Sequence, residues 1–378
     1  MVDVFKVAEI LVENLKEGYG EDVGIVAYYG SYATGDASET SDLDMFYIPD
    51  DGKTLPLYSS FIFKELPFEF WPISWGFAEK IASGKQSYAV APSLIANAKV
   101  LYSRSEEDLQ RFKGIQKRIE ELQKPENKRT MIKEAQEVYK TIPFYFEKLA
   151  LSIREGDAAS IRIAALEFID ISVDCLALIN QTYFNRVWWA DYEKLQSFEK
   201  RPESLLELIK TISNSEDFLA IEEAAVKLKG EIRDILLAEQ KQLGKKYSFQ
   251  DVFDGYYPGI FEYVNKVLSA CDKKNEVAMY SAAAKIQNEI SLMLSMCYAE
   301  AEYSSFNIYK EYRKTFDGLE FPDVASYLHN GDFSKISEQI KAFNDRALEL
   351  IKENSMKLDK FEELEELRAF VKEKSATI

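Results

Sequence analysis

The pattern of apolar residues changes near residue 105, and this change limits the folds that the chain can adopt. Before it, short apolar runs such as 23–29 and 42–48 are bounded by turn residues, which is typical of β-strands. After it, apolar residues recur at helical spacing almost to the C-terminus. We therefore predict an α+β protein. A small mixed-sheet domain is expected over residues 1–105, and a large all-helical domain over 106–378, with two sub-bundles dividing near 250.

Within the first domain, amphipathic spacing predicts a helix over residues 3–17, and residues 57–64 and 67–73 are expected to form a β-hairpin. A helix at 75–83 and a short strand at 100–102 complete this domain. Breaks at Pro and Gly residues divide the remainder into segments. The predicted helices there are 106–123, 127–154, 157–184, 202–213, 216–243, 258–271, 275–313, 334–353 and 358–374.

Charge and cysteine content exclude several classes of function. The chain has 47 Lys and Arg against 64 Asp and Glu, a net charge of −17, which disfavours binding to a nucleic-acid backbone. The acidity could attract cations or serve only solubility, and composition does not decide between the two. The 3 Cys fit neither a disulfide framework nor a zinc pattern. No signal peptide or long apolar span is visible, so we expect a cytoplasmic protein that does not bind membranes.

The segment between the first two predicted strands carries the chemistry. Gly30 follows a buried strand directly, so the backbone can turn tightly and a ligand can approach closely. Ser31 is expected to begin a helix, where its hydroxyl and free N–H groups could bind phosphate oxygens. Asp42 and Asp44 lie two residues apart on the second strand, so their carboxylates would share one face. Adjacent carboxylates repel each other, and a divalent cation would neutralise them.

Glu69 is the best candidate for a third carboxylate at this site. It lies between Phe68 and Phe70 on a predicted strand, so it would face away from both aromatic rings. Glu65 is the reserve candidate, although its neighbours Lys64 and Pro67 indicate a turn. A third acid could bind a second metal ion or accept a proton from an attacking hydroxyl.

Gly-Ser, a spacer of about ten residues, Asp-x-Asp and a later acid together resemble the nucleotidyltransferase superfamily of DNA polymerase β. Among its members the sequence is most similar to kanamycin nucleotidyltransferase-like small-molecule adenylyltransferases, which append a helical domain. The resemblance covers residues 23–73 best. It implies that Gly30 and Ser31 hold the triphosphate of ATP or another NTP, and that Asp42, Asp44 and Glu69 bind two Mg²⁺ ions.

The same resemblance implies that a nucleoside monophosphate, AMP if the donor is ATP, passes to a hydroxyl of a small acceptor and that pyrophosphate leaves. A cationic acceptor such as an aminoglycoside would suit an acidic cleft, and the resemblance allows a homodimer. Many family members carry a basic residue soon after Gly-Ser. Here Tyr32-Ala33-Thr34-Gly35 follows instead, so the basic contacts of the triphosphate are not identified.

Several alternatives stay open at this stage. The segment could be a polar turn followed by an exposed edge strand. The chain could also be a non-catalytic or regulatory nucleotide-binding module that retains the fold, although three intact acids speak against a lapsed site. Addition to nucleic-acid ends is disfavoured by the charge, whereas transfer of AMP to a protein remains open.

A second group of acids lies in the helical region. Glu167, Asp170 and Asp174 occur at i, i+3 and i+7 on a helix built otherwise from apolar residues. We call these three residues the carboxylate stripe. One member, Glu167 in our assignment, could activate the acceptor hydroxyl, and the others could bind its ammonium groups. The alternative is an ordinary solvated helix face, with Ser160 and Gln181 as its companions.

An aromatic segment, residues 178–189, follows the stripe and ends in Trp188 and Trp189. It could line a pocket for the acceptor or the base, or it could pack as a helix end against its neighbours. Arg186 and Lys194 are candidates for contacts with the triphosphate. His329 is the only histidine, so histidine-centred catalysis and a multi-histidine zinc site are not expected.

Overall fold

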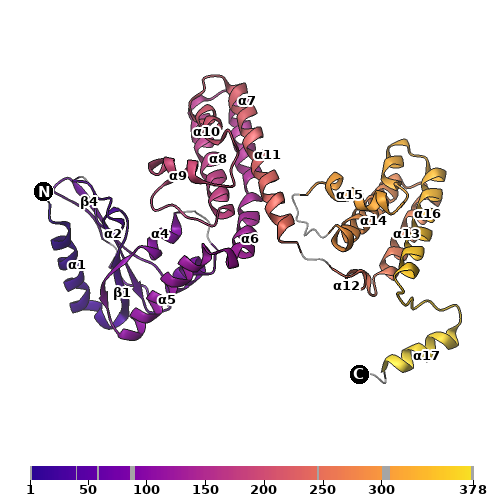
Figure 1. Ribbon diagram of the computed structural model, residues 1–378, viewed down its shortest axis with the longest axis horizontal. Coiled ribbons are helices and arrows are strands. Elements are labelled where there is room, and N and C mark those ends of the chain that lie inside the picture. Colours follow the sequence, from indigo (N-terminus) through magenta and orange to yellow (C-terminus); the bar gives the residue numbers. More distant parts are fainter. Residues whose placement is uncertain are drawn as a thin grey trace. The chain divides into compact units, whose positions relative to one another are not determined.

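The computed structural model describes residues 2–39, 41–57, 59–85, 90–244, 247–299 and 307–375 (Figure 1). The chain forms two compact units, Met1–Glu239 and Gln240–Ile378. The first unit contains a five-stranded sheet and helices, and the described part of the second contains helices only. This is the α+β architecture that the sequence predicts. None of the described helices is both long enough and apolar enough to cross a membrane.

The sheet belongs to the first hundred residues. Its strands are β1 (Val23–Tyr28), β2 (Asp44–Pro49), β3 (Ser59–Phe63), β4 (Leu66–Pro72) and β5 (Lys99–Ser103), in the spatial order β3-β4-β2-β1-β5. β2 and β4 are parallel, and the other neighbours are antiparallel. Since β2 lies between β4 and β1, the edge-strand alternative is wrong. The predicted hairpin turns at Lys64 and Glu65, both of which have positive φ angles.

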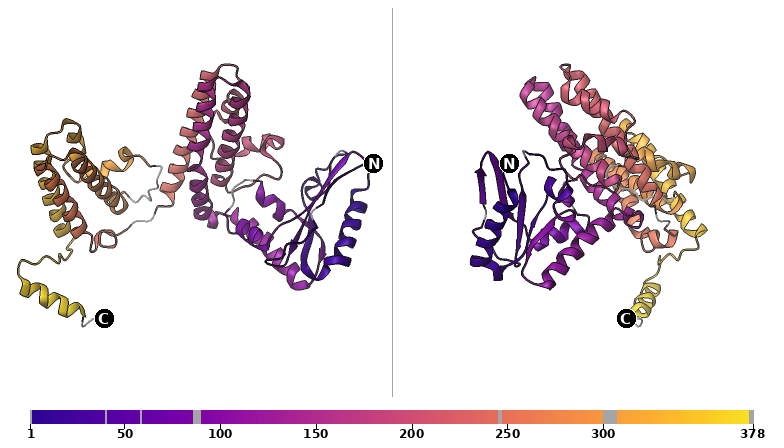
Figure 2. Two further views of the ribbon diagram at one scale, coloured as in Figure 1. Left: turned by 180° about the vertical axis from the view of Figure 1, so that it is seen from behind. Right: turned by 60° about the vertical axis from the view of Figure 1, so that its left-hand side comes forward.

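Helices flank the sheet and make up the rest of the first unit (Figure 2). They are α1 (Val4–Tyr19), α2 (Ser31–Thr34), α3 (Trp75–Ala82), α4 (Ala91–Ala96), α5 (Glu106–Leu122), α6 (Lys128–Tyr139), α7 (Ile142–Glu155), α8 (Ala158–Ile179), α9 (Tyr192–Ser197), α10 (Leu205–Asn214) and α11 (Phe218–Gln242). Short 3₁₀ turns are η1 (Gly20–Asp22), η2 (Pro125–Asn127) and η3 (Trp188–Ala190).

The second unit is built around α13 (Tyr257–Asp272) and α14 (Glu276–Tyr298), which pack against each other. Its other elements are α12 (Phe249–Phe253), α15 (Tyr309–Gly318), η4 (Val324–Asn330), α16 (Phe333–Glu353) and α17 (Leu364–Ser375). One apolar core joins α13, α14 and α16. Inside it, Gln287 donates to Tyr309 Oη and Asp323 Oδ1, each at 2.7 Å, so this polar side chain is satisfied.

Three predicted helices divide or end several residues early, and the predicted helix 358–374 begins only at Leu364. The segment 127–154 divides into α6 and α7 because Pro143 is tolerated only in the first turn of a new helix. The segment 157–184 ends at Ile179, where Asn180 caps α8 and Gln181 has a positive φ angle. The segment 275–313 ends its first helix at Tyr298, and residues 300–306 lie outside the described part of the chain.

The two faces of the sheet bury different cores. On one face, Val7, Val12 and Leu15 of α1 pack against Met45 of β2 and Phe70 of β4. On the other face, alternate side chains of β1 and β2 pack against α3, α4 and α5. These are Ile25, Ala27, Phe46 and Ile48. Burial on both sides explains why β1 and β2 have almost continuous apolar sequences.

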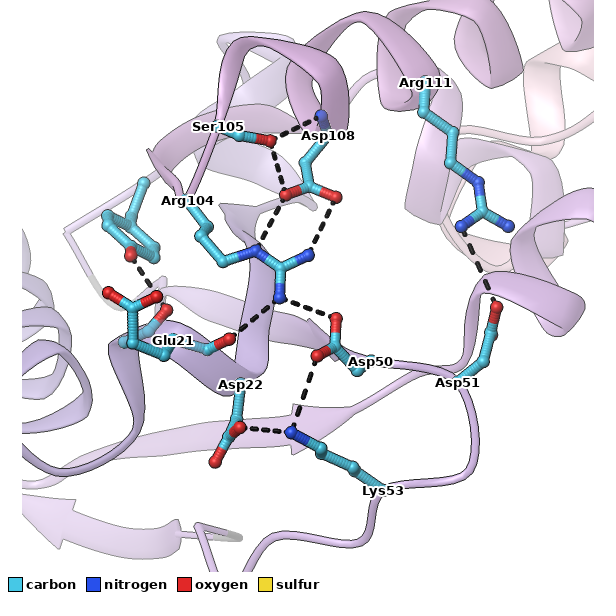
Figure 3. A network of polar contacts seen from close by, with 11 residues as sticks. Glu21, Asp22, Asp50, Asp51, Lys53, Arg104, Ser105, Asp108 and Arg111 are labelled. Carbon is cyan, nitrogen blue, oxygen red and sulfur yellow. Dashed lines mark hydrogen bonds and ion pairs between the residues drawn. The ribbon is translucent and has the colours of Figure 1, made fainter.

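A polar network centred on Arg104 holds the start of α5 to the sheet (Figure 3). Arg104 donates two hydrogen bonds to Asp108, at 3.0 and 3.2 Å, and others to Asp50 Oδ1 at 2.7 Å and Glu21 O at 2.8 Å. Burial alone would raise the pKa of Asp108, but hydrogen bonds from Arg104 and Ser105 hold it below its ordinary value. The network therefore contributes stability only while Asp108 is ionised.

We predict that Arg104→Ala lowers the free energy of unfolding of the first unit by about 2–3 kcal/mol, because Asp108 is left buried without its cation. The loss should shrink below about pH 4. There Asp108 becomes protonated in the unfolded chain, so its ion pair with Arg104 contributes less to the stability of the fold. All 4 Trp residues lie in the first unit, so denaturant unfolding followed by tryptophan fluorescence reports on that unit.

Arg118→Ala is the matched control. Arg118 pairs with Glu79 at the surface, where its side chain is 47% exposed, so its loss should cost less than about 1 kcal/mol. Equal losses for the two variants would contradict the role assigned to Arg104.

Candidate functional site

The parallel pairing of β2 and β4 brings two of the predicted acids together. Asp44 is the first residue of β2, and Glu69 of β4 is its register partner. Phe68 and Phe70 are buried on the α1 face, whereas Glu69 is exposed on the opposite face, as the alternation predicts. Asp44 shares its face with Phe46, which packs towards α3–α5. Both carboxylates therefore lie on the α3–α5 face of the sheet.

Asp42 lies near them but is not on the strand. β2 begins at Asp44, so the expectation that both aspartates sit on one strand is wrong, and Asp42 belongs to the loop before it. Its charge nevertheless acts on Asp44. Burial, together with the charges of Asp42 and Glu69, raises the pKa of Asp44 to about 6. No positive group among the described residues offsets this shift.

The turn after β1 closes around Asp44. Gly30 has φ 71° and ψ −153°, a conformation that only glycine adopts without strain. A Cβ at this position would collide with Oδ2 of Asp44. The hydrogen bonds of the turn begin at Ala33, whose N–H donates to Gly30 O at 3.0 Å. The N–H groups of Ser31 and Tyr32 thus have no acceptor among the described residues.

Two aromatic residues at this site were not identified from the sequence. Trp71 Nε1 donates to Tyr29 Oη at 3.1 Å, and both side chains pack on the α3–α5 core. Burial raises the pKa of Tyr29, and the charge of Asp44 raises it further, so the hydroxyl stays protonated. A signal for Trp71 was present, since it lies two residues after Glu69 and must share its face. Tyr29 precedes Gly30 directly, but nothing in its sequence context marks it.

The donor chemistry of Asp42, Asp44 and Glu69 fits a divalent cation. Carboxylate oxygens are the ligands that Mg²⁺ prefers, and this group carries negative charge without a paired Lys or Arg among the described residues. The side chains do not form a finished cage. Across the described part of the chain, no three His, Cys, Asp or Glu side chains are grouped closely enough to hold a metal ion. Glu65, the reserve acid, lies in the β3–β4 turn.

The carboxylate stripe lines a pocket of about 330 Å³ in the first unit. Its three acids are half-buried on α8, so the stripe is not simply a solvated helix face. Lys148 of α7 forms an ion pair with Glu167. Asp170 accepts a hydrogen bond from Trp188 Nε1 at 2.6 Å. Burial raises the pKa of Asp170, and the charge of Glu167 adds to the effect.

The other wall of this pocket comes from the loop after α8. Residues 180–191, here called the aromatic loop, contribute Phe184, Trp188 and Trp189 to the lining. The segment both packs on its neighbours and lines this pocket, and a role in binding an acceptor or a base stays a prediction. Phe184 is buried and packs on Phe198 with ring centroids 5.8 Å apart, whereas Trp189 is 64% exposed although it lines the pocket.

Contacts of the aromatic loop place the pocket on the same side of the sheet as Asp44. Arg186 lies 3.4 Å from Asp36 Oδ2, in the turn segment that follows Ser31. Asn97 Nδ2 donates to Asn185 Oδ1 at 3.1 Å, and Tyr183 packs on the α3–α5 core. Arg186 is therefore a described cation that contacts the turn segment after Ser31.

Two other predicted residues have different surroundings. The ammonium group of Lys194 donates to Tyr183 O and lies 5.6 Å from the Phe184 ring centroid. Burial lowers the pKa of Lys194. This lysine thus supports the aromatic loop. His329 lies in η4 of the second unit.

Comparisons with known proteins give a distant structural likeness. No family model matches the sequence, and no curated protein matches it. Among solved structures, the chain is similar to a nucleotidyltransferase-like protein from Exiguobacterium sibiricum 255-15, with 9% sequence identity and a TM-score of 0.39. The match covers 65% of this chain and 84% of that chain. A likeness this distant carries no argument about the site.

We predict that Asp44→Asn stabilises the first unit at pH 8. A folded pKa of about 6 against an ordinary 3.8 means that stability falls as the pH rises through this window. The full shift corresponds to about 3 kcal/mol, and partial exposure reduces the expected gain to about 1–2 kcal/mol. The gain should fall to about half at pH 5. Denaturant unfolding followed by tryptophan fluorescence at the two pH values measures it.

Glu17→Gln, on the exposed face of α1, is the control and should change stability little at either pH. Millimolar Mg²⁺ at pH 8 should raise the unfolding midpoint of the wild type and of Glu17→Gln, but not that of Asp44→Asn. An Asp44→Asn variant no more stable than the wild type at pH 8 would show that ionised Asp44 does not destabilise the fold, through burial or through the neighbouring charges.

Proposed function

We propose that this chain transfers a nucleoside monophosphate from a nucleoside triphosphate to a hydroxyl of a small acceptor and releases pyrophosphate. AMP from ATP is the transfer that we favour. The observation that carries the proposal is that the charges of Asp42 and Glu69 act on half-buried Asp44 beside the glycine turn, without a neutralising Lys or Arg among the described residues. Mutual repulsion of this kind persists where a bound cation offsets it, and it has no value to the fold itself.

The residues of the turn suit the polyphosphate of the donor. The N–H groups of Ser31 and Tyr32 have no acceptor among the described residues, and the absence of a side chain at Gly30 leaves room beside Asp44. Arg186 can exchange Asp36 for a phosphate oxygen, because its ion pair is long and half-exposed. These groups would position the donor and balance part of its charge.

Asp42, Asp44 and Glu69 would hold Mg²⁺, two ions if both sites of the family pattern are present. When bound, Mg²⁺ supplies charge neutralisation at the reacting phosphate and the leaving pyrophosphate. Tyr29 and Trp71 close the site on the side of the α3–α5 core and restrict water there.

A carboxylate of the stripe would accept the proton of the acceptor hydroxyl. Glu167 was the candidate from the sequence, but its ion pair with Lys148 occupies part of its carboxylate. Asp170 is the alternative, since burial raises its pKa towards the range of a useful general base. The pocket that both residues line is where we place the acceptor.

A non-catalytic nucleotide-binding protein is the second candidate. It is favoured by one observation, the lack of a finished three-ligand metal group among the described residues. Such a protein would bind Mg-ATP, and Asp44→Asn would weaken that binding, but no acceptor would stimulate pyrophosphate release.

We predict that Asp42→Asn, Asp44→Asn and Glu69→Gln each abolish pyrophosphate release from Mg-ATP while the chain stays folded. The loss should exceed the roughly 10–100-fold that follows changes in the outer shell of a metal site, because these carboxylates would be ligands of the metal itself. Pyrophosphate release across a panel of aminoglycosides, lincosamides and nucleosides measures it.

Glu65→Gln is the control on the same hairpin. Glu65 lies in the β3–β4 turn, four positions before Glu69. The Glu65→Gln variant should therefore leave turnover unchanged. Wild-type turnover in either aspartate variant would refute the transferase assignment.

A further inference from the structure

The pocket of the carboxylate stripe has a lining that selects a class of ligand. Seven of its ten lining residues carry apolar or aromatic side chains, and the other three are the acids of the stripe. Its volume of about 330 Å³ lies at the lower end of the range for small-molecule sites, roughly 300–1,000 Å³. A ligand must therefore be small, and most of its surface must be apolar.

Hydrogen bonding fixes the orientation of one aromatic wall. The indole N–H of Trp188 donates to Asp170, and its ring packs on Tyr192 with centroids 6.4 Å apart. Trp189 lines the same pocket while 64% of its surface is exposed to water. A ligand that covers Trp189 would remove this apolar surface from water.

The charge in the pocket is only partly balanced. Glu167 has Lys148 as its partner, whereas Asp170 receives a hydrogen bond from a neutral indole. The lining includes no Lys or Arg. A carboxylate beside aromatic faces, partly shielded from water, is the combination that attracts an organic cation, because both the carboxylate and the ring faces are negative.

We propose that this pocket binds a small organic cation with one charged nitrogen and a flat or apolar body. A polyamine fits less well. It would need several open carboxylates along a polar wall, whereas Glu167 is already paired and seven of the ten lining residues are apolar or aromatic. This narrows the cationic acceptor expected from the sequence. As the acceptor site, the pocket rests on the transferase function proposed above, whereas binding itself does not require turnover.

The direct test is calorimetric titration of the full chain with three probes. Benzylamine is the cation, benzyl alcohol is its neutral counterpart of similar shape, and spermidine is the polyamine. Benzylamine should bind at least about 5-fold more tightly than benzyl alcohol, within the range of cation–π and carboxylate contributions. Spermidine should bind no more tightly than benzylamine.

Two variants test the assignment to this pocket. Asp170→Asn should weaken benzylamine at least about 5-fold and leave benzyl alcohol unchanged. Trp188→Leu should weaken the binding of both probes. If Trp188→Leu does not fold, Trp189→Leu is used in its place, because Trp189 is mostly exposed. Asp234→Asn is the control, because the Asp234 side chain on α11 is 77% exposed and does not line the pocket.

The outcomes separate the proposals. Equal affinity for benzylamine and benzyl alcohol, wild-type affinity in Asp170→Asn, or tighter binding of spermidine would each overturn the organic-cation assignment. Loss of benzylamine binding in Asp170→Asn supports it even if Asp44→Asn retains turnover, a result that refutes only the transferase. Conversely, Asp44→Asn could abolish turnover while benzylamine fails to bind the wild type. That result would support the transferase and refute only the assignment of this pocket.

Discussion

The parallel pairing of β2 with β4 places Glu69 beside Asp44, and the candidate site depends on this register. The burial of Phe68 and Phe70 against α1 fixes it. A slip by one residue would turn Glu69 into the α1 layer and expose both phenylalanines, because side chains alternate between the faces of a strand. Burying one such ring is worth about 1.5–3 kcal/mol. Two rings therefore outweigh the cost of ionised Asp44, which its burial and the charges of Asp42 and Glu69 together set at about 3 kcal/mol or less.

Because the apolar burial outweighs the cost of ionised Asp44, the fold can hold this carboxylate without a cationic side chain beside it. Arg104 shows what this sheet does where charge serves the fold, since its guanidinium bonds Asp108, Asp50 and a backbone carbonyl together. The described residues supply no such partner to Asp44. Arg104 and Asp44 both lie in the first unit. The difference in how their charges are balanced therefore comes from the residues around each of them and not from the arrangement of helices and strands. A carboxylate that the fold tolerates at a cost is a candidate for a role outside the fold.

Much of this could be predicted from the sequence, because strand periodicity and turn residues are local signals. Alternation around Glu69 predicted its face, and the apolar run before Gly30 predicted β1. The parallel register of β2 and β4 was not predictable, since pairing depends on packing between distant residues. The end of α8 at Ile179 was missed because its sequence stays apolar to the cap. Tyr29 was missed for a related reason, as its contact with Trp71 joins residues 42 positions apart.

The residues proposed to hold the metal and those proposed to bind the acceptor lie on elements of different kinds. Asp44 and Glu69 lie on paired strands that the core fixes. One wall of the stripe pocket is instead the aromatic loop, held by Asn180, Arg186 and Lys194. Substitutions in a loop disturb the core less than substitutions in a central strand. The residues that choose the acceptor can therefore change while Asp44 and Glu69 keep their register. Because Arg186 lies two positions from Trp188 and contacts the turn at Asp36, a ligand that shifts the aromatic loop would also act on the turn segment that we propose to bind the donor.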